Sequence, residues 1–214
     1  LVTISREAGT NAHGIGRYLI MRLAEYADPD LNAGWDLFDQ KLCALIAQNK
    51  SLDADYDALM HDKYRQGGLH RLVYELLIGT PQEYRIQKKI EEVIRLLARL
   101  GKVVVIGRGG FQLARPMPGA IHLRLVAPLE FRVHAMVQYE HLTEDAAVRA
   151  IRETDAERAR FLKRHFNCDI QDPTHFDLVW NVARFKVSEI VNATAELVRM
   201  RLQQLRETKA IHAP

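Results

Sequence analysis

Leu1-Val2-Thr3-Ile4 opens the sequence and runs into Ser5-Arg6-Glu7-Ala8-Gly9-Thr10-Asn11-Ala12-His13-Gly14. The first four residues are apolar or β-branched, which predicts a buried strand. A glycine-bearing turn follows, and the spacing of Ile15, Leu19 and Leu23 predicts a helix after it. A strand, a turn and a helix in this order can direct backbone N–H groups and a helix dipole at a phosphate. The order therefore makes the turn a candidate phosphate-binding loop.

A phosphate-binding loop of the form GxxxxGK[ST] would occupy this same place after a first strand. Its glycines let the backbone close on the phosphates, its Lys balances their charge, and its hydroxyl binds Mg²⁺. Here the Lys and the Ser or Thr are absent, so the stretch alone is also compatible with an ordinary strand–turn–helix connection. The position at the first strand and the adjacent arginine favour phosphate binding. The candidate residues are Arg6, Gly9, Thr10, Asn11, Ala12, His13 and Gly14.

The rest of the chain alternates between strand and helix patterns. Further strands are predicted at Trp35–Phe38, Val103–Ile106, Ile121–Val126 and Phe176–Trp180. Helices are predicted over about 39–48 and 85–100, after Pro128, after the cap Thr143, and from the cap Ser188 to about Arg206, and Thr80-Pro81 marks a helix start. Two or three helices are expected within 50–82. This alternation predicts an α/β fold with three layers and a parallel sheet.

Composition sets broad limits on function. The 214 residues suit one domain, and 48% hydrophobic with 27% charged residues is typical of a globular protein. The net charge of +3 suits an anionic ligand such as a nucleotide but is too small to indicate nucleic acid. No apolar run approaches the roughly 18 residues of a membrane span. Cys43 and Cys168 show no metal or disulfide spacing, so we expect no metal site and a cytoplasmic location.

Two further segments could carry chemistry. Arg108 lies between glycines directly after the predicted strand Val103–Ile106, where its planar donors could reach a phosphate or a base; the alternative is a surface ion pair. Asp155 and Arg158 are three residues apart and share a helix face. Phosphoryl transfer needs positioning and charge neutralisation, which a helix bearing arginines could supply. In isolation, a solvated helix with ion pairs explains that second segment better.

Taken together, the segments resemble the cytidylate kinase-like family, relatives of the bacterial cytidylate kinases among the nucleoside monophosphate kinases. The resemblance covers nearly the whole chain and depends on the order and spacing of its motifs. These are Ile4-Ser5-Arg6-Glu7 with Gly9, Phe38-Asp39, Val105-Ile106-Gly107-Arg108-Gly109, Val126-Ala127-Pro128-Leu129-Glu130-Phe131-Arg132, Asp155 with Arg158, and Phe176-Asp177-Leu178-Val179 with Asn181.

The resemblance implies one P-loop kinase domain over 1–214, with a five-stranded parallel sheet, an acceptor-binding insertion at about 40–100 and a lid at about 143–170. It implies that 9–14 hold the phosphates of ATP, bound with Mg²⁺. It places Asp39, Arg108 and Gly109 at the acceptor nucleotide. It places three residues on the lid side of the transferring phosphoryl group: Arg132, Asp155 and Arg158.

Three positions depart from the cytidylate kinase pattern. Ala12 stands where those kinases carry the loop Lys, and His13 stands where the Mg²⁺-binding hydroxyl would follow. Gly109 replaces an Asp that helps read the cytosine amino group. Loss of a hydrogen-bonding carboxylate lowers discrimination between bases.

Three functions remain open from the sequence. The first is an ATP-dependent phosphotransferase acting on CMP or dCMP, and the second is a non-catalytic nucleotide-binding module, which the missing Lys favours. The third is a kinase for a different small acceptor held by the 50–82 segment, which contains Tyr56, Tyr64, Arg65, His70, Arg71 and Tyr74. We expect a nucleotide or another small phosphorylated ligand as partner. The sequence gives no indication of the oligomeric state.

Overall fold

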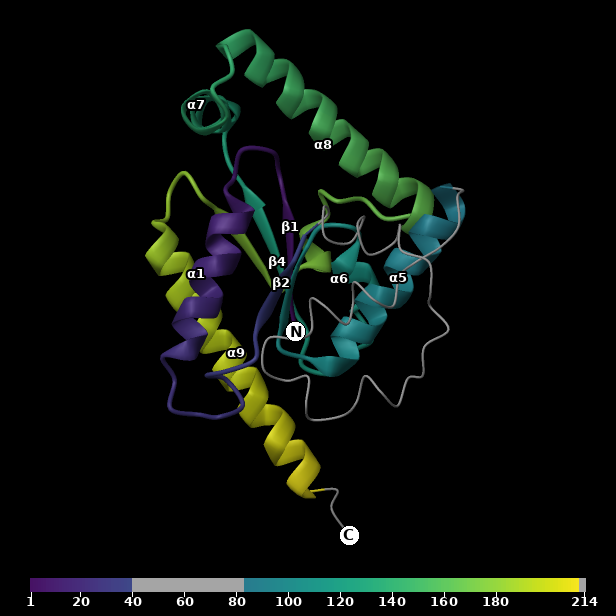
Figure 1. Cartoon of the computed structure of the whole chain (residues 1–214), viewed down its shortest axis with the longest axis vertical. Coiled ribbons are helices and arrows are strands. Elements are labelled where there is room, and N and C mark those ends of the chain that lie inside the picture. The colour runs from purple at the N-terminus through teal and green to yellow at the C-terminus, as the bar shows by residue number, and fades with distance from the viewer. Residues whose placement is uncertain (40–82, 212–214) are drawn as a thin grey trace.

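A parallel five-stranded sheet forms the centre of the computed structural model, which describes residues 1–39 and 83–211 (Figure 1). Its strand order is β2-β3-β1-β4-β5, and all neighbouring pairs are parallel. The strands are β1 Val2–Arg6, β2 Asp36–Phe38, β3 Val103–Ile106, β4 Ile121–Val126 and β5 Leu178–Asn181. The helices are α1 Ala12–Ala24, α5 Glu83–Leu100, α6 Gly110–Leu113, α7 Leu129–Glu140, α8 Glu144–Phe166 and α9 Val187–Ile211. This arrangement confirms the predicted α/β fold class.

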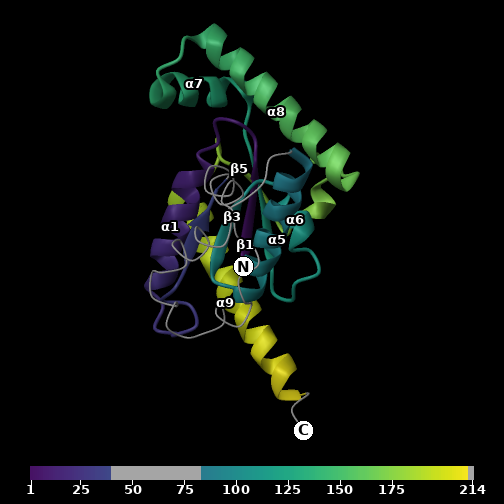
Figure 2. The ribbon, with the colours of Figure 1, turned by 45° about the vertical axis from the view of Figure 1, so that its right-hand side comes forward.

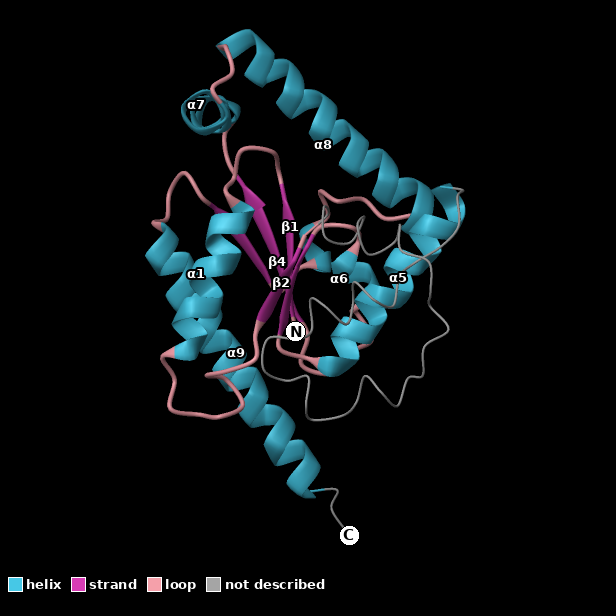
Figure 3. Ribbon diagram, in the orientation of Figure 1, coloured by secondary structure: helices cyan, strands magenta, loops and turns pink. Residues whose placement is uncertain are grey.

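The sheet separates two helical layers (Figure 3). Alternate residues of a strand point to opposite faces, and on one face Val2 and Ile4 pack with α1 and α9, which contribute Leu19 and Ile190. These four side chains are fully buried. On the other face lie Thr3 and Val105, which are the side chains nearest to Gly110 at the start of α6. Because both faces are covered, the central strands are apolar without the alternation of a half-exposed sheet.

Helices α7 and α8 lie across the carboxyl ends of the strands (Figure 2). Thr143 begins α8 as predicted: its hydroxyl accepts a hydrogen bond from the Ala146 N–H at 3.3 Å. Asn167 ends the helix in the left-handed conformation, with φ of 47°. Ligands of parallel α/β sheets bind at the carboxyl ends of the strands, so α8 covers the edge where a site is expected.

Several predicted boundaries needed correction. Ser188 is not the cap of α9 but lies within it; the Glu189 carboxylate instead accepts from the Lys186 N–H at 2.7 Å. The helix also continues past Arg206 to Ile211. Strand β5 begins at Leu178, because the Phe176 ring packs against the Phe111 ring before the strand starts, with the two ring centroids 4.9 Å apart.

Other predictions fall outside the described residues. These are the helix over 39–48, the helices within 50–82, the start at Thr80-Pro81, Cys43 and most of the acceptor-binding insertion. Cys168 is a buried free thiol. None of the helices in the described ranges is both long and apolar enough to cross a membrane.

Arg206 of α9 forms ion pairs with the loop between α1 and β2. Its guanidinium donates two hydrogen bonds to Asp28, at 2.7 and 2.8 Å, and one to Asp30 at 2.5 Å. The hydrogen bonds from Arg206 lower the pKa of Asp28 from 3.8 to about 2. Because the pKa of Asp28 is lower in the folded than in the unfolded chain, this carboxylate stabilises the fold at pH values above 3.8. The stabilisation is lost as the pH falls from 3.8 through about 2.

We expect Arg206→Ala to return the pKa of Asp28 toward 3.8 in a carboxyl NMR titration. Arg199→Ala is the matched control, because Arg199 pairs with Glu196 on its own helix. An unchanged Asp28 pKa in the Arg206 variant would contradict this assignment of the ion pair.

Candidate active site

The loop between β1 and α1 has a conformation that only particular residues allow. Asn11, at φ of 54°, caps α1 by accepting a hydrogen bond from the Gly14 N–H at 3.2 Å. A side chain at Gly14 would meet the Asn11 carboxamide. At Gly9, with φ of +82°, a Cβ would lie 2.8 Å from the Arg132 carbonyl oxygen. The loop therefore lies closely against the start of α7 at Gly9, and the absence of a side chain at Gly14 leaves room for the Asn11 cap.

A cavity of about 400 Å³ opens at the carboxyl ends of β1 and β3, beneath α8. Its size lies in the range of small-molecule sites. Gly107, Arg108 and Gly109 follow β3 with φ of 79°, 54° and 68°, which turns the chain sharply along the cavity. The Arg6 guanidinium lies directly over Gly107, where a side chain would collide with it. The described lining residues are Ser5, Arg6, Gly107, Arg108, Gly109, Phe111, Thr154, Glu157, Arg158, Phe161, Leu162 and Ile170.

Three arginines from three elements converge on this cavity: Arg6 from β1, Arg108 from the turn after β3 and Arg158 from α8. Burial, together with the nearby charges of Arg158 and Arg108, lowers the pKa of Arg6 to about 10. Burial also lowers the pKa of Arg158, against the opposing influence of Asp155. Partly desolvated guanidiniums that repel one another favour an anion between them. The cavity thus has the charge distribution of a candidate site for an anionic ligand.

A second cluster joins α7 and α8 to the loop. Arg132, 9% exposed, donates from Nη1 to the Asp155 carboxylate at 2.6 Å and from Nε to the Ala127 carbonyl at 3.0 Å. The other Asp155 oxygen accepts from the Ala8 N–H at 2.8 Å. Glu7 accepts from the Ala127 N–H at 3.0 Å and lies 3.5 Å from Arg132 Nε. The Asp155 carboxylate of α8 therefore accepts a hydrogen bond from a backbone N–H of the loop, and such N–H groups are the donors that bind phosphates in phosphate-binding loops.

Arg158 connects the cavity with this cluster. Its Nη1 donates to the Arg6 carbonyl at 3.1 Å and to Asp155 at 3.4 Å. The pairing confirms that Asp155 and Arg158 share one face of a helix. Arg152 and Arg160, on the same helix, are exposed and do not line the cavity. Of Arg152, Arg158 and Arg160, only Arg158 lines the cavity.

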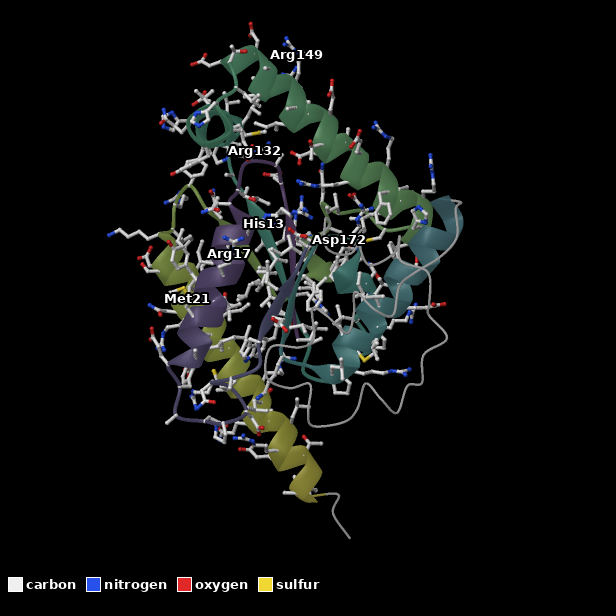
Figure 4. The ribbon with its side chains drawn as sticks, in the orientation of Figure 1. His13, Arg17, Met21, Arg132, Arg149 and Asp172 are labelled. Carbon is white, nitrogen blue, oxygen red and sulfur yellow. The ribbon has the colours of Figure 1, made fainter. Side chains whose placement is uncertain are left out.

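The opening of α1 lacks the groups of an intact phosphate-binding loop. Ala12 is 4% exposed and carries no charge, and His13 Nε2 lies 3.0 Å from Asp39 Oδ2. Thr10, 2% exposed, donates its hydroxyl to the Glu7 carbonyl at 2.8 Å. His13 and Arg132 both lie toward the carboxyl end of the sheet (Figure 4).

The loop does not fit a magnesium ion held by the protein, because no free hydroxyl stands at its helix start. Within residues 1–39 and 83–211, no three His, Cys, Asp or Glu side chains gather closely enough to bind a metal.

The predicted site residues thus fall into neighbouring groups. Arg6, Arg108, Gly109 and Arg158 line the cavity; Arg132 and Asp155 form the cluster beside it; 9–14 form the loop and the helix start. His13 and Asp39 meet next to the loop. Sequence reasoning missed the cluster's Glu7 and the apolar lining. The α8 residues could have been found, because they recur at one helix face: Thr154, Glu157, Arg158, Phe161 and Leu162.

The chain is similar in sequence to two cytidylate kinases. A cytidylate kinase of Sulfolobus acidocaldarius is 33% identical over 104 residues, which are 47% of this chain and 56% of that enzyme. A cytidylate kinase of Methanocaldococcus jannaschii is 24% identical over 119 residues, 55% of this chain and 67% of that enzyme. The chain therefore matches little more than half of the first relative's length.

The chain also resembles a solved structure in its fold. The crystal structure of an uncharacterized protein from Eubacterium ventriosum superimposes with a TM-score of 0.67 at 14% identity, covering 92% of this chain and 97% of that one. Residues 1–184 match the family model described as the cytidylate kinase-like family. Since this match spans most of the chain, including the loop, the cavity and α8, the protein belongs to the cytidylate kinase-like family.

Proposed function

We propose that the protein is an ATP-dependent phosphotransferase that moves a phosphoryl group to a nucleoside monophosphate such as CMP or dCMP. The observation that carries the proposal is the convergence of Arg6, Arg108 and Arg158 on one cavity at the carboxyl ends of the strands. A phosphate monoester dianion would offset the burial and the repulsion between arginines that lower the pKa of Arg6. Family membership and the sequence similarity to two cytidylate kinases support the same activity.

The reaction transfers the γ-phosphoryl group between two phosphate oxygens. An oxygen of the acceptor phosphate attacks the γ-phosphorus, the bond to the β–γ bridging oxygen breaks, and ADP leaves. Arg6 and Arg108 would hold the acceptor phosphate, and Arg158 would stabilise the negative charge on the transferring group. The loop 9–14 would face the donor phosphates. Any Mg²⁺ would come with the nucleotide, held by its phosphates and water.

The direct test is a search for product. The protein is incubated with ATP, Mg²⁺ and CMP, dCMP or UMP, and the nucleotides are separated by chromatography. We expect a nucleoside diphosphate to form together with an equal amount of ADP. Formation of ADP alone would indicate ATP hydrolysis and would count against transfer to these acceptors.

A non-catalytic nucleotide-binding module is the second candidate, favoured by a specific contact. Asp155 already occupies the Ala8 N–H, and Ala12 supplies no charge to the donor phosphates. If the loop stays closed in this way, ATP or CMP would bind without being converted. In this outcome calorimetry detects nucleotide binding, while chromatography detects no phosphorylated product. A kinase for a different acceptor would instead yield product only with acceptors outside this panel.

A further inference from the structure

Arg124 of β4 is a buried arginine that keeps one donor without a partner. It is only 7% exposed, and in the described part of the chain no group accepts a hydrogen bond from its Nη1. The guanidinium lies over the Phe176 ring, 5.7 Å from the ring centroid. Stacking on a ring offsets only part of the cost of removing a guanidinium from water. A charged group buried in this way needs an explanation other than stability.

Arg124 lies directly behind the cavity lining. In the pairing of β1 with β4 it is opposite Ser5, which lines the cavity. The Phe176 ring under the guanidinium packs against Phe111, another lining residue, with the two centroids 4.9 Å apart. Burial is the main cause that lowers the pKa of Arg158, and the nearby charge of Arg124 acts in the same direction. The charge of Arg124 therefore acts on the cavity although the residue does not line it.

The carboxylates around Arg124 bind other groups. Burial lowers the pKa of Arg124, while the charges of Glu7, Asp155 and Asp169 act to raise it. Each of these carboxylates accepts a hydrogen bond from a different donor: the pairs are Glu7 with the Ala127 N–H at 3.0 Å, Asp155 with Arg132 Nη1 at 2.6 Å, and Asp169 with the Gln171 N–H at 2.9 Å. A charge in a poorly solvated place acts more strongly at a distance than a charge in water. An anion in the cavity would therefore be attracted by Arg124.

We propose that Arg124 is a specificity-determining residue that acts through its charge, from behind the cavity lining, and selects a doubly charged phosphate. The inference rests on the phosphotransferase function proposed above. A phosphate monoester is a dianion above its second pKa of about 6. At the same place it gains twice the Coulomb energy of a carboxylate or a phosphodiester, which carry one charge. The ligand class that Arg124 favours is thus a terminal phosphate monoester, as in a nucleoside monophosphate.

Thermal unfolding without ligand tests whether Arg124 serves the fold. Arg124→Met replaces the guanidinium with an apolar side chain. We expect its Tm to equal or exceed that of wild type, because the change removes the cost of burying a charge that lacks a close partner. Arg149→Met, at an exposed arginine of α8 outside the cavity, is the control and should keep Tm within about 1 °C (Figure 4). A fall in Tm clearly beyond that of the control would assign the guanidinium to the fold and overturn the inference.

Calorimetry with CMP and cytidine tests the action on the ligand, because these two compounds differ only in the phosphate. We expect Arg124→Met to weaken CMP binding by about tenfold or more and to change cytidine binding by less than about twofold. Arg124→Lys keeps a positive charge and should retain most of the affinity for CMP, while Arg149→Met should change neither Kd. An unchanged Kd for CMP in Arg124→Met, or an equal loss with cytidine, would overturn the inference and leave the phosphotransferase in place.

Inorganic phosphate separates the inference from the proposed function. It is titrated at pH 7.5 into wild type, Arg124→Met and Arg124→Lys, and binding is followed by NMR of the arginine side chains. If CMP is neither bound nor converted while phosphate binding falls about tenfold in Arg124→Met and is retained in Arg124→Lys, the proposed function fails and the role of Arg124 stands. Equal phosphate affinity in wild type and Arg124→Met would overturn the inference. A wild-type protein that binds neither phosphate nor CMP would overturn both.

Discussion

Replacing Arg158 with alanine is expected to lower the rate of phosphoryl transfer by about a thousandfold or more while the chain still folds. An arginine that stabilises the transferring phosphoryl group contributes an effect of about 10³–10⁵ in related reactions. Arg158 is the one described α8 arginine that lines the cavity, and its side chain is 25% exposed, so truncation leaves no large buried hole. Its charge lies close enough to Arg6 to lower the pKa of that residue. Its position in the cavity and its charge next to Arg6 both favour a role in neutralising the negative charge of the ligand.

The experiment compares turnover of wild type, Arg158→Ala and Arg160→Ala. Arg160 is exposed on the same helix and outside the cavity, so its removal controls for the loss of one positive charge. Arg158→Lys tests for the planar fork, because a lysine keeps the charge but cannot form two parallel hydrogen bonds. Circular dichroism confirms that each variant folds. Turnover of Arg158→Ala within about tenfold of wild type would exclude the role assigned to this residue.

The fold could be predicted from the sequence because its strong signals are local. Val103–Ile106 is apolar on both faces, and Val2–Ile4 is similar, as buried parallel strands require. The errors lie where a distant contact decides. Strand β5 starts late because Phe176 packs against Phe111, and α9 starts at Val187 because Glu189 caps the preceding residue. No pattern within a short window contains that information.

The candidate site could be predicted in its arginines but not in its connections. Arg108 and Arg158 follow from motif and helix spacing. The contact of Asp155 with the Ala8 N–H joins residues 147 positions apart, and sequence spacing gives no sign of it. The packing of the Phe166 ring against Gly109 is hidden for the same reason, because it joins the end of α8 to a glycine after β3.

The cluster of Arg132, Asp155 and Glu7 indicates that the side of the site formed by α7 and α8 also supports the fold. Arg132 is buried and donates to the Ala127 carbonyl and to Asp155, and its Nη1 lies 3.4 Å from the Ala8 carbonyl. Truncating one partner of a buried charge pair leaves the other charge desolvated and unpaired. Asp155 and Glu7 keep 27% and 25% of their side-chain surface exposed, so water can compensate part of that cost. The effect should therefore be large but below that of a fully buried pair.

Arg132→Ala is thus expected to lower the free energy of unfolding by about 3 kcal/mol, which corresponds to a fall in Tm of about 8 °C for a chain of this size. Denaturant and thermal unfolding measure both quantities. Arg149→Ala, an exposed arginine on α8, is the matched control and should change stability by less than about 0.5 kcal/mol. Because Arg132 holds the Asp155 carboxylate on the loop, Asp155→Asn combined with Arg132→Ala should cost less than the sum of the two single changes. Additive losses would show that the two side chains act independently, and the cluster would then be a set of separate contacts instead of one unit joining α7, α8 and the loop.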